Sequence, residues 1–468
     1  MTTHQEDRMT MDTADQLAGT ERSTAQAELA AALKGALCLP GDPAYDGVVM
    51  PWNVAVPVRP AAVVVAADAL DVSTAVRYAA EHGLRVAVQC TGHGAAAGVD
   101  DGVLLVSTAG LDLVEVRPDG TARVGAGVRW QQVVDASVPH GYAPLNGSSL
   151  DVGVVGYTTG GGVGPMARTF GLASDQVTAF DVVTADGTLR RATPAENQDL
   201  FWGLRGGKGC LGIVTAVEFT LVPVVSLYGG GLWFDGADAS AVLNAWRSWS
   251  ADLPEQATSS VAMMQLPPMP GVPPQLAGKL TVSVRFAFVG DAAVGEALLA
   301  PMRAAVEPLL DGVGVLPYAA VDAIHADPVD PLPFHERGAL LADLPPEAVE
   351  ALVAAAGAGS GSPLIMVEIR QLGGAVAREG VHPSAFSHRD APYSLLCIGV
   401  AVPPVVDATV AYAAAVLEAL RPWSTGGLLP NFGGGGTTAY NAEDLARLRS
   451  LMEAHDPARL LVAGDALR

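Results

Sequence analysis

The sequence from residue 85 to residue 98 reads RVAVQCTGHGAAAG. A short β-type run ends here in a loop of small residues with His93 at its centre. Small residues let backbone N–H groups approach a ligand closely, and successive N–H groups can line a concave site for an anion. A histidine in such a loop would face the ligand rather than pack in a core. The stretch therefore predicts a strand that leads into a ligand-binding loop.

The sequence around this loop predicts alternating strands and helices. Residues 61–66, 85–89 and 103–107 are rich in β-branched or apolar side chains and predict strands. Between the first two strands, Asp71 or Ser73 is expected to cap a helix. The His93 loop therefore belongs to a β-α-β-β unit.

Two further glycine-rich regions follow within 130 residues of the first. Residues 153–164 read GVVGYTTGGGVG, and residues 205–212 read RGGKGCLG before an alternating strand at 213–221. Each region alone could be only a turn. Together they favour one bulky diphosphate cofactor held by several loops, because backbone N–H groups can bind a pyrophosphate without a P-loop lysine.

A different interpretation of the second region is a Rossmann site. Residues 162–167 read GVGPMA, which matches the pattern G-x-G-x-x-A, and Asp181 lies about 20 residues further on. That fingerprint requires a strand directly before the first glycine. Here Tyr157-Thr158-Thr159 precedes it in a glycine-rich loop and Pro165 interrupts it, so we disfavour a Rossmann site.

Composition limits the class of protein. The chain has 468 residues, of which 50% are hydrophobic and 16% charged, so we expect a well-buried protein of two domains. Its net charge of −22 argues against binding to nucleic acid or an anionic membrane. Four scattered cysteines show no zinc pattern, so no metal site is expected. No signal-like or membrane-spanning segment stands out, which leads us to expect a cytoplasmic protein.

The distribution of residue types along the sequence predicts an α+β protein in three parts. Residues 1–25 are expected to form a disordered tail, and residues 26–223 a cofactor-binding domain that residues 424–468 complete. Residues 224–423 contain long strands and Ala-rich helices with many prolines. They predict a substrate domain with an antiparallel sheet covered by helices.

Several motifs in order along the chain resemble one family. The motif Thr91-Gly92-His93-Gly94, the loop at 152–164, DLFWGLRGG at 199–207 and GIVT at 212–215 are similar to those of FAD-linked oxidases. The family is the vanillyl-alcohol oxidase/p-cresol methylhydroxylase (PCMH-type) superfamily, in its berberine bridge enzyme-like branch. The resemblance continues in QLGGA at 371–375 and in FSHR at 386–389. It implies a PCMH-type FAD-binding domain followed by a substrate domain.

The resemblance also implies how FAD is held. His93 aligns with the histidine that bonds covalently to the flavin 8α-methyl group, and such a bond would raise the oxidising power of the flavin. An alternative is a loop histidine that contacts phosphate without a covalent bond. The residues expected to bind the cofactor are Thr91, Gly92, His93, Gly94, Ala95, Gly98, Gly153, Gly156, Tyr157, Gly160, Gly161, Gly162, Gly164, Gly212, Ile213, Val214 and Asn431.

Three departures from the family pattern matter. Many relatives carry a second tether, a cysteine just before the glycine that aligns with Gly153, but residues 146–151 contain none and Ser149 or a neighbour takes its place. A single covalent link to His93 is therefore expected. Tyr157 replaces a histidine common near the flavin pyrimidine. The C-terminal motif reads LPNF at 429–432, so the tyrosine that often serves as base is missing.

The general base is consequently open among three candidate catalytic residues. The strand at 393–399 should pass the substrate side of the flavin, with Tyr393, Leu395 and Cys397 on one face. Glu368 lies on a neighbouring strand, and Tyr157 lies in the second glycine-rich loop. Each of these side chains also has a structural interpretation, as a core residue or half of an ion pair.

The sequence thus predicts an FAD-dependent oxidoreductase. We expect an oxidase in which hydride from a small hydrophobic natural product moves to flavin N5 and O₂ reoxidises the flavin, within secondary metabolism. The protein is expected to be a monomer or homodimer. The alternatives are an FAD-containing cyclase with no net oxidation, a carbohydrate oxidase, and a binding protein that has lost its catalytic residues.

Overall fold

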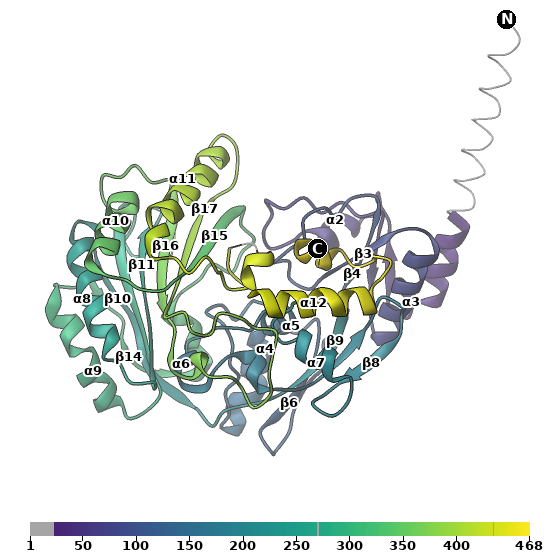
Figure 1. Cartoon of the computed structure of the whole chain (residues 1–468), viewed down its shortest axis with the longest axis horizontal. Helices are drawn as coiled ribbons and strands as arrows, with labels where there is room; N and C mark the ends of the chain where they lie inside the picture. The colour runs from purple at the N-terminus through teal and green to yellow at the C-terminus, as the bar shows by residue number, and fades with distance from the viewer. Residues whose placement is uncertain (1–22, 269–270, 434) are drawn as a thin grey trace, which may run out of the picture.

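The computed structural model describes residues 23–268, 271–433 and 435–468, which form three β-sheets flanked by helices (Figure 1). Two sheets belong to the N-terminal half and the third to the C-terminal half. The last long helix, α12 (Ala442–His455), returns to the N-terminal half and contacts α7 (Gln198–Gly203). This mixture of helices and sheets confirms the predicted α+β class.

The first sheet delivers the His93 loop. Its order is β1-β2-β4-β3, in which β2, β4 and β3 run parallel and β1 pairs antiparallel with β2. All five residues of β4 are buried, because apolar side chains of the sheet form one core with α3 (Ala69–Glu81) and a second core on the other face. The strands are β1 (Ala36–Cys38), β2 (Ala62–Val65), β3 (Arg85–Gln89) and β4 (Val103–Ser107).

The second sheet is antiparallel and forms the core of the N-terminal half. Its order is β5-β6-β9-β7-β8. Apolar residues from α4 (Trp130–Ser137), α7 and α12 pack with it in one cluster. The strands are β5 (Val114–Val116), β6 (Thr121–Gly125), β7 (Val177–Val183), β8 (Leu189–Ala192) and β9 (Ile213–Thr220).

The third sheet has eight strands, and its two faces differ in chemistry. Val367, Ile369 and Leu395 lie in an apolar core with the helices on one face, whereas Glu368 and Arg370 alternate onto the other. The sheet order is β13-β10-β12-β11-β16-β17-β15, with β14 also paired to β10. The strands are β10 (Ser226–Asp235), β11 (Ala257–Gln265), β12 (Leu280–Phe288), β13 (Leu310–Asp311), β14 (Gly314–Pro317), β15 (Phe334–Leu341), β16 (Leu364–Gln371) and β17 (Tyr393–Val400).

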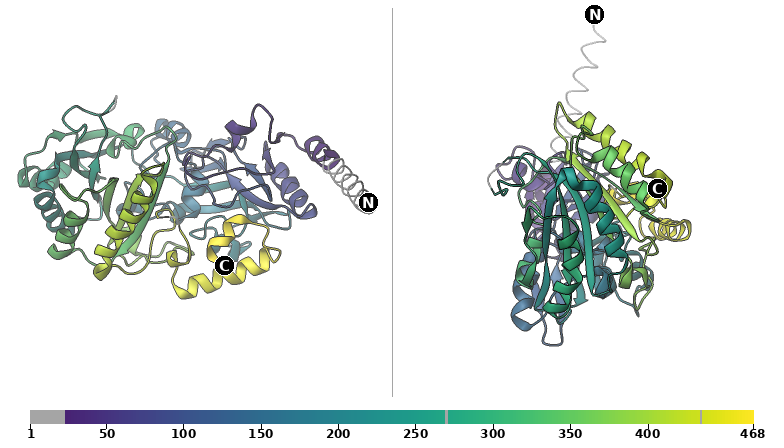
Figure 2. Two further views of the ribbon diagram at one scale, coloured as in Figure 1. Left: turned by 90° about the horizontal axis from the view of Figure 1, so that it is seen from above. Right: turned by 90° about the vertical axis from the view of Figure 1, so that its left-hand side faces the viewer.

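Four helices cover the apolar face of this third sheet, as Figures 1 and 2 show. The helices are α8 (Ala239–Ala251), α9 (Ala292–Ala305), α10 (Pro346–Ala356) and α11 (Val406–Ala419). An antiparallel sheet covered by helices on one face was predicted for residues 224–423. The polar face remains available to meet the N-terminal half.

A buried arginine ties the two halves together. Arg168, in the short helix α6 (Ala167–Phe170), donates from Nε to Ala257 O at 2.8 Å and from Nη2 to Leu253 O at 3.1 Å. Its Nη1 donates to Leu372 O. One cation of the N-terminal half therefore satisfies three carbonyls of the C-terminal half.

Three local predictions need correction. Asp68 caps α3 through its side chain, whereas Asp71 is buried and accepts hydrogen bonds from the backbone of Lys34, Gly35 and Ala67. Residues 154–159, expected as loop, form the helix α5 (Val154–Thr159).

The third correction concerns residues 23–25, expected in a disordered tail, which are helical. The rest of that expected tail lies outside the described residues. We keep the domain boundaries at residues 223 and 424 as a proposal. In the described part of the chain, no helix has both the length and the apolar character to cross a membrane.

Candidate active site

His93 lies at the centre of the loop that leaves β3, and its ring is fixed from two sides. The Trp52 ring stacks on it with ring centroids 4.5 Å apart, and His93 Nδ1 lies 2.8 Å from Thr91 Oγ1. Gly92 is needed beside it, since its φ is +76° and a Cβ would lie 2.5 Å from Pro51 Cα. The loop thus presents one oriented imidazole.

The imidazole is also held neutral. Burial lowers the pKa of His93 to about 4, because the attraction of Asp151 does not offset the desolvation of the charged form. The ring is neutral at physiological pH and has a lone pair available for bonding. This is the state that attack on an electrophilic carbon, or coordination of a hydrogen-bond donor, requires.

The second glycine-rich region approaches this loop through α5 and the glycines after it. A Cβ on Gly160 would lie 2.0 Å from Asn431 Oδ1, and one on Gly161 would lie 2.3 Å from the Phe386 ring. Likewise, a Cβ on Gly162 would collide with the Tyr157 ring, and one on Gly164 would collide with Asn146 O. These glycines allow backbone segments to pack closely, and the Gly162 loop follows a helix rather than a strand, contrary to a Rossmann fingerprint.

Lys208 is the residue that sequence reasoning missed. It has φ of +57°, donates its backbone N–H to Thr159 O, and extends its side chain past Gly160 towards Gly94. Its Nζ lies 4.0 Å from the position of a Cβ on Gly94. Burial lowers the pKa of Lys208, although Glu336 of β15 opposes this shift.

Lys208 connects the three predicted glycine-rich regions. It belongs to the third region, and its side chain lies between the first region and the second. The signal in the sequence was the lysine in an otherwise glycine-rich run, one of three lysines in the chain.

Asn431 and Tyr157 join the C-terminal segment to α5. Asn431 Nδ2 donates to Tyr157 O at 2.8 Å, which fixes the loop containing Phe432 against the second glycine-rich region. The Tyr157 hydroxyl is buried and has no hydrogen-bond partner among the described residues. Burial raises the pKa of Tyr157, so the phenol keeps its proton. An unpaired buried hydroxyl is a group that a bound ligand could satisfy.

Glu368 lies on the strand next to β17 as predicted, on the polar face of the third sheet, but it is not a free base. Arg285 Nη1 donates to its Oε1 at 2.5 Å, Arg370 Nε to its Oε2 at 2.7 Å, and Ser260 Oγ to its Oε1 at 2.8 Å. Burial raises the pKa of Glu368, but the charges of Arg370 and Arg285 outweigh it and the net shift is downward. The carboxylate is therefore half of an ion-pair network.

Tyr393 and Cys397 share a face of β17 as predicted, but that face is the helix-covered one. Tyr393 packs near Trp246 with ring centroids 6.2 Å apart, and Cys397 is buried in the same core. Ser394 and Leu396 occupy the opposite face beside Arg370 and Glu368. The expected face of this strand was wrong, because alternation alone does not reveal which side the helices cover.

The remaining expected cofactor residues fall into two groups. Ala95, Gly98, Gly153 and Gly156 lie in or beside the loops described above, and nothing within 4 Å would meet a Cβ on Gly98 or Gly156. Gly212 directly precedes β9, and Ile213 and Val214 begin it and point into apolar cores. Only the backbone of the second group could meet a ligand.

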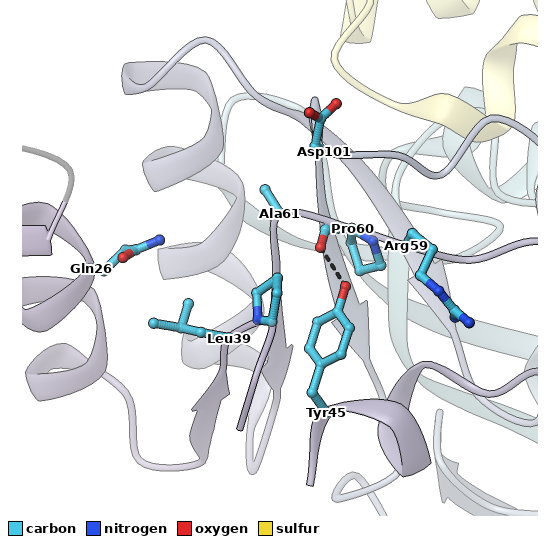
Figure 3. A pocket seen from close by; sticks show the side chains of 8 residues that line it. Gln26, Leu39, Tyr45, Arg59, Pro60, Ala61 and Asp101 are labelled. Atoms are coloured by element: carbon cyan, nitrogen blue, oxygen red, sulfur yellow. Dashed lines mark hydrogen bonds between the residues drawn. The ribbon is translucent and has the colours of Figure 1, made fainter. Parts of the chain in front are cut away.

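One cavity lies away from these residues. It has a volume of about 570 Å³ and opens beside β1 and β2, where Tyr45 donates its hydroxyl to Pro60 O at 2.6 Å and Arg59 and Asp101 border it (Figure 3). None of the residues that line it belongs to the glycine-rich regions or to the polar face of the third sheet. We assign it no role in the site.

Comparisons with known proteins agree with this geometry. The FAD binding domain family matches residues 60–193, which contain the His93 loop and the second glycine-rich region. The FAD-linked oxidoreductase sorD of Penicillium rubens is 26% identical over 453 residues, covering 90% of this chain and 93% of its own. The similarity to a named oxidoreductase thus extends over both halves.

Solved structures show the same fold. BBE-like 1 of Physcomitrella patens superposes with a TM-score of 0.84 at 22% identity, over 95% of this chain and 99% of its own. Glucooligosaccharide oxidase from Acremonium strictum gives 0.78 at 19% identity, over 93% and 97%. That oxidase carries a 6-S-cysteinyl, 8α-N1-histidyl FAD.

Proposed function

We propose that this chain, which belongs to the FAD-dependent oxidoreductases of the berberine bridge enzyme-like family, is an oxidase of a small hydrophobic natural product. The observation that supports the proposal is the neutral, oriented His93 imidazole at the meeting point of three glycine-rich regions. A place in the oxidative tailoring of secondary metabolites in the cytoplasm is part of the same proposal.

The residues present fit FAD. The Lys208 side chain, which lies between the first two glycine-rich regions, and the Tyr157 hydroxyl, which has no partner among the described residues, are groups that an anionic, hydrogen-bonding ligand could contact. His93 would form the single covalent link, since residues 146–151 contain no cysteine. The backbone of Gly92, Gly94 and the second region would hold the diphosphate. Bound FAD would supply the hydride acceptor at N5 and would pass the electrons to O₂.

The three candidate residues would help to orient the substrate rather than act as a strong general base. Glu368 is neutralised by two arginines, and Tyr393 faces the helices. Tyr157, the remaining candidate, has a raised pKa and would donate a hydrogen bond through its hydroxyl. We propose that it positions the reacting group and that water between the halves takes the proton.

The scarcity of bases favours one alternative, an FAD-containing cyclase with no net oxidation. Anaerobic mixing separates the two functions. In the proposed oxidase, an oxidisable hydrophobic alcohol or amine bleaches the visible flavin absorbance, and admission of O₂ restores it with release of hydrogen peroxide. A cyclase converts its substrate anaerobically with no lasting bleaching. Chitooligosaccharides serve as the test of the carbohydrate-oxidase alternative, and rapid bleaching by them would replace our proposed substrate class.

The covalent link has its own test. Acid precipitation of the purified protein should give a yellow pellet, and His93→Ala should give a colourless one. His140→Ala, a change of an exposed histidine, is the matched control and should stay yellow. A yellow pellet from His93→Ala would reject His93 as the tether, and a protein purified without bound flavin would reject the whole proposal.

A further inference from the structure

Arg370 holds an unusual place on the polar face of the third sheet. On β16 it pairs in register with Ser260 of β11 and with Ser394 of β17. Serine side chains are too short to cover a guanidinium that extends above them. The end of the Arg370 side chain is therefore left open towards the N-terminal half.

Two arginines, Arg285 and Arg370, donate to the single carboxylate of Glu368. Arg285 is 1% exposed and is fully enclosed, with Nη1 on Glu368 and Nη2 near Met264 Sδ at 3.2 Å. Arg370 is 12% exposed and uses only Nε, on the other carboxylate oxygen of Glu368. Among the hydrogen bonds of the described residues, the Arg370 side chain makes only this one, through Nε. Arg285 thus completes the ion pair with Glu368, and the two Nη groups of Arg370 remain available as hydrogen-bond donors.

The surroundings of this fork belong to the candidate active site. The guanidinium lies 5.0 Å from the centre of the Phe432 ring, in the segment that Asn431 fixes to Tyr157. Arg370 is also the charged group that acts on the Tyr157 phenol. Asp327 is near enough to influence Arg370 electrostatically, but no hydrogen bond joins them within the described residues. The Arg370 guanidinium therefore lies beside the Phe432 ring, and its charge opposes the burial that raises the pKa of Tyr157.

The space behind Arg370 is small. A cavity of about 20 Å³ lies between the sheet and the Gly164–Pro165 turn, with Arg285 and His325 in its wall. It has room for about one water molecule. A larger ligand must consequently meet Arg370 from its exposed edge, beside Phe432.

We propose that Arg370 binds a carboxylate of the substrate. The two Nη–H groups form the planar fork that pairs with the two oxygens of a carboxylate, and Phe432 offers an apolar face for the body of the same molecule. This inference rests on the proposed function and narrows its substrate to a hydrophobic molecule that bears a carboxylate. Arg370 is then a specificity-determining residue.

The test compares two probes of one shape on the flavin-loaded protein. Benzoate and benzamide share a ring, but only benzoate carries the charge. Dissociation constants are measured at pH 7 from the perturbation of the flavin spectrum and by calorimetry. We expect benzoate to bind at least tenfold more tightly than benzamide, and Arg370→Gln to abolish that preference. Arg370→Lys should keep part of it, because it retains charge without the fork.

Matched variants keep the result interpretable. Arg337→Gln changes an exposed arginine on β15 of the same sheet and should leave the preference intact. If Arg370→Gln fails to fold because Glu368 loses a partner, Arg370→Lys, which keeps a charge beside Glu368, carries the test, and its preference for benzoate should be smaller than that of the unaltered protein.

Three results would overturn the inference. They are equal binding of the probes by the unaltered protein, a preference that survives Arg370→Gln, and tighter binding of 4-nitrophenolate than of benzoate. A change in the flavin spectrum of Arg370→Gln with an unchanged probe preference would assign Arg370 to the cofactor instead. All four are measured on flavin-loaded protein, whereas failure of the proposed function is seen as a missing flavin band or as no bleaching by a hydrophobic alcohol or amine.

Discussion

Arg285 and Glu368 form a buried ion pair across two strands of the third sheet, with Nη1 and Oε1 2.5 Å apart and the side chains 1% and 0% exposed. Arg370, which is 12% exposed, donates to the other oxygen of Glu368 at 2.7 Å. Neither charge is open to bulk solvent, so each depends on the other and on their shared neighbours. The polar face of the sheet is therefore a rigid electrostatic platform rather than a set of free acids and bases.

Removing one charge of this platform should be costly. Glu368→Gln leaves two arginines without their anion, and we expect the free energy of unfolding to fall by about 3–5 kcal/mol. Denaturant titration followed by circular dichroism measures it. Glu418→Gln, which breaks the exposed pair with Arg421, should change stability by less than about 1 kcal/mol. A small effect of Glu368→Gln would mean that water reaches the cluster.

The Arg285–Glu368 pair should also make the stability of the fold depend on pH in the acid range. Because the pKa of Glu368 is lowered in the folded chain from an ordinary 4.5, its contribution to stability is complete above about pH 4.5. It is lost only as pH falls through the lower, folded pKa. The difference in melting temperature between the unaltered protein and Glu368→Gln should thus stay constant from pH 8 to pH 5 and shrink in stronger acid. A difference that shrinks already between pH 8 and pH 6 would contradict this.

His93 should form its flavin link over a wide range of pH. The proposed reaction needs a neutral imidazole, and the pKa of about 4 keeps it neutral down to that pH. Apoprotein mixed with FAD should gain acid-stable flavin at a similar rate from pH 8 to pH 5.5. In-gel flavin fluorescence follows the rate. A steep loss between pH 7 and pH 6 would show that His93 titrates as an ordinary histidine.

Gly156, inside α5, and Gly160, at its C-terminal end, form a matched pair of positions for substitution. Gly160→Ala would place a Cβ 2.0 Å from Asn431 Oδ1 and 2.9 Å from Lys208 Cε, so both the melting temperature and the flavin content should fall. Gly156→Ala meets nothing within 4 Å and removes a helix-weakening glycine, which should raise apoprotein stability by about 0.5–1 kcal/mol. If Gly156 contacts FAD as proposed, this stabler variant still binds less flavin. Normal flavin content in Gly156→Ala would remove Gly156 from the cofactor site.

Tyr157→Phe tests the unpaired hydroxyl. Deleting a buried hydroxyl with no partner should leave the apoprotein equally stable or slightly more so. The affinity for FAD or substrate should drop, since a bound ligand would lose that hydrogen bond. Thermal unfolding and flavin titration of the apoprotein measure the two effects separately. A marked loss of apoprotein stability would show that protein or water already satisfies the hydroxyl.

The sequence predicted the strands and loops that carry the site better than it predicted their surroundings. The β3–His93 loop was found because strand periodicity and glycine content are local signals. The face of β17 was misassigned because both faces alternate equally, and helices from other parts of the sequence, such as α8 and α10, decide which face is buried. Lys208 and the Arg285–Glu368 pair were missed for the same reason. Their meaning depends on β15, β12 and the Asn431 segment, which only the fold brings together.

Arg168 limits how a substrate can enter. Swinging the two halves apart would strip one buried cation of its bonds to Leu253, Ala257 and Leu372 at once. Admission and release must therefore proceed through local displacement of surface segments, with the halves acting as a fixed frame. The rate of turnover would then be governed by how quickly such a segment moves aside, and viscosity should slow it without altering the chemistry inside.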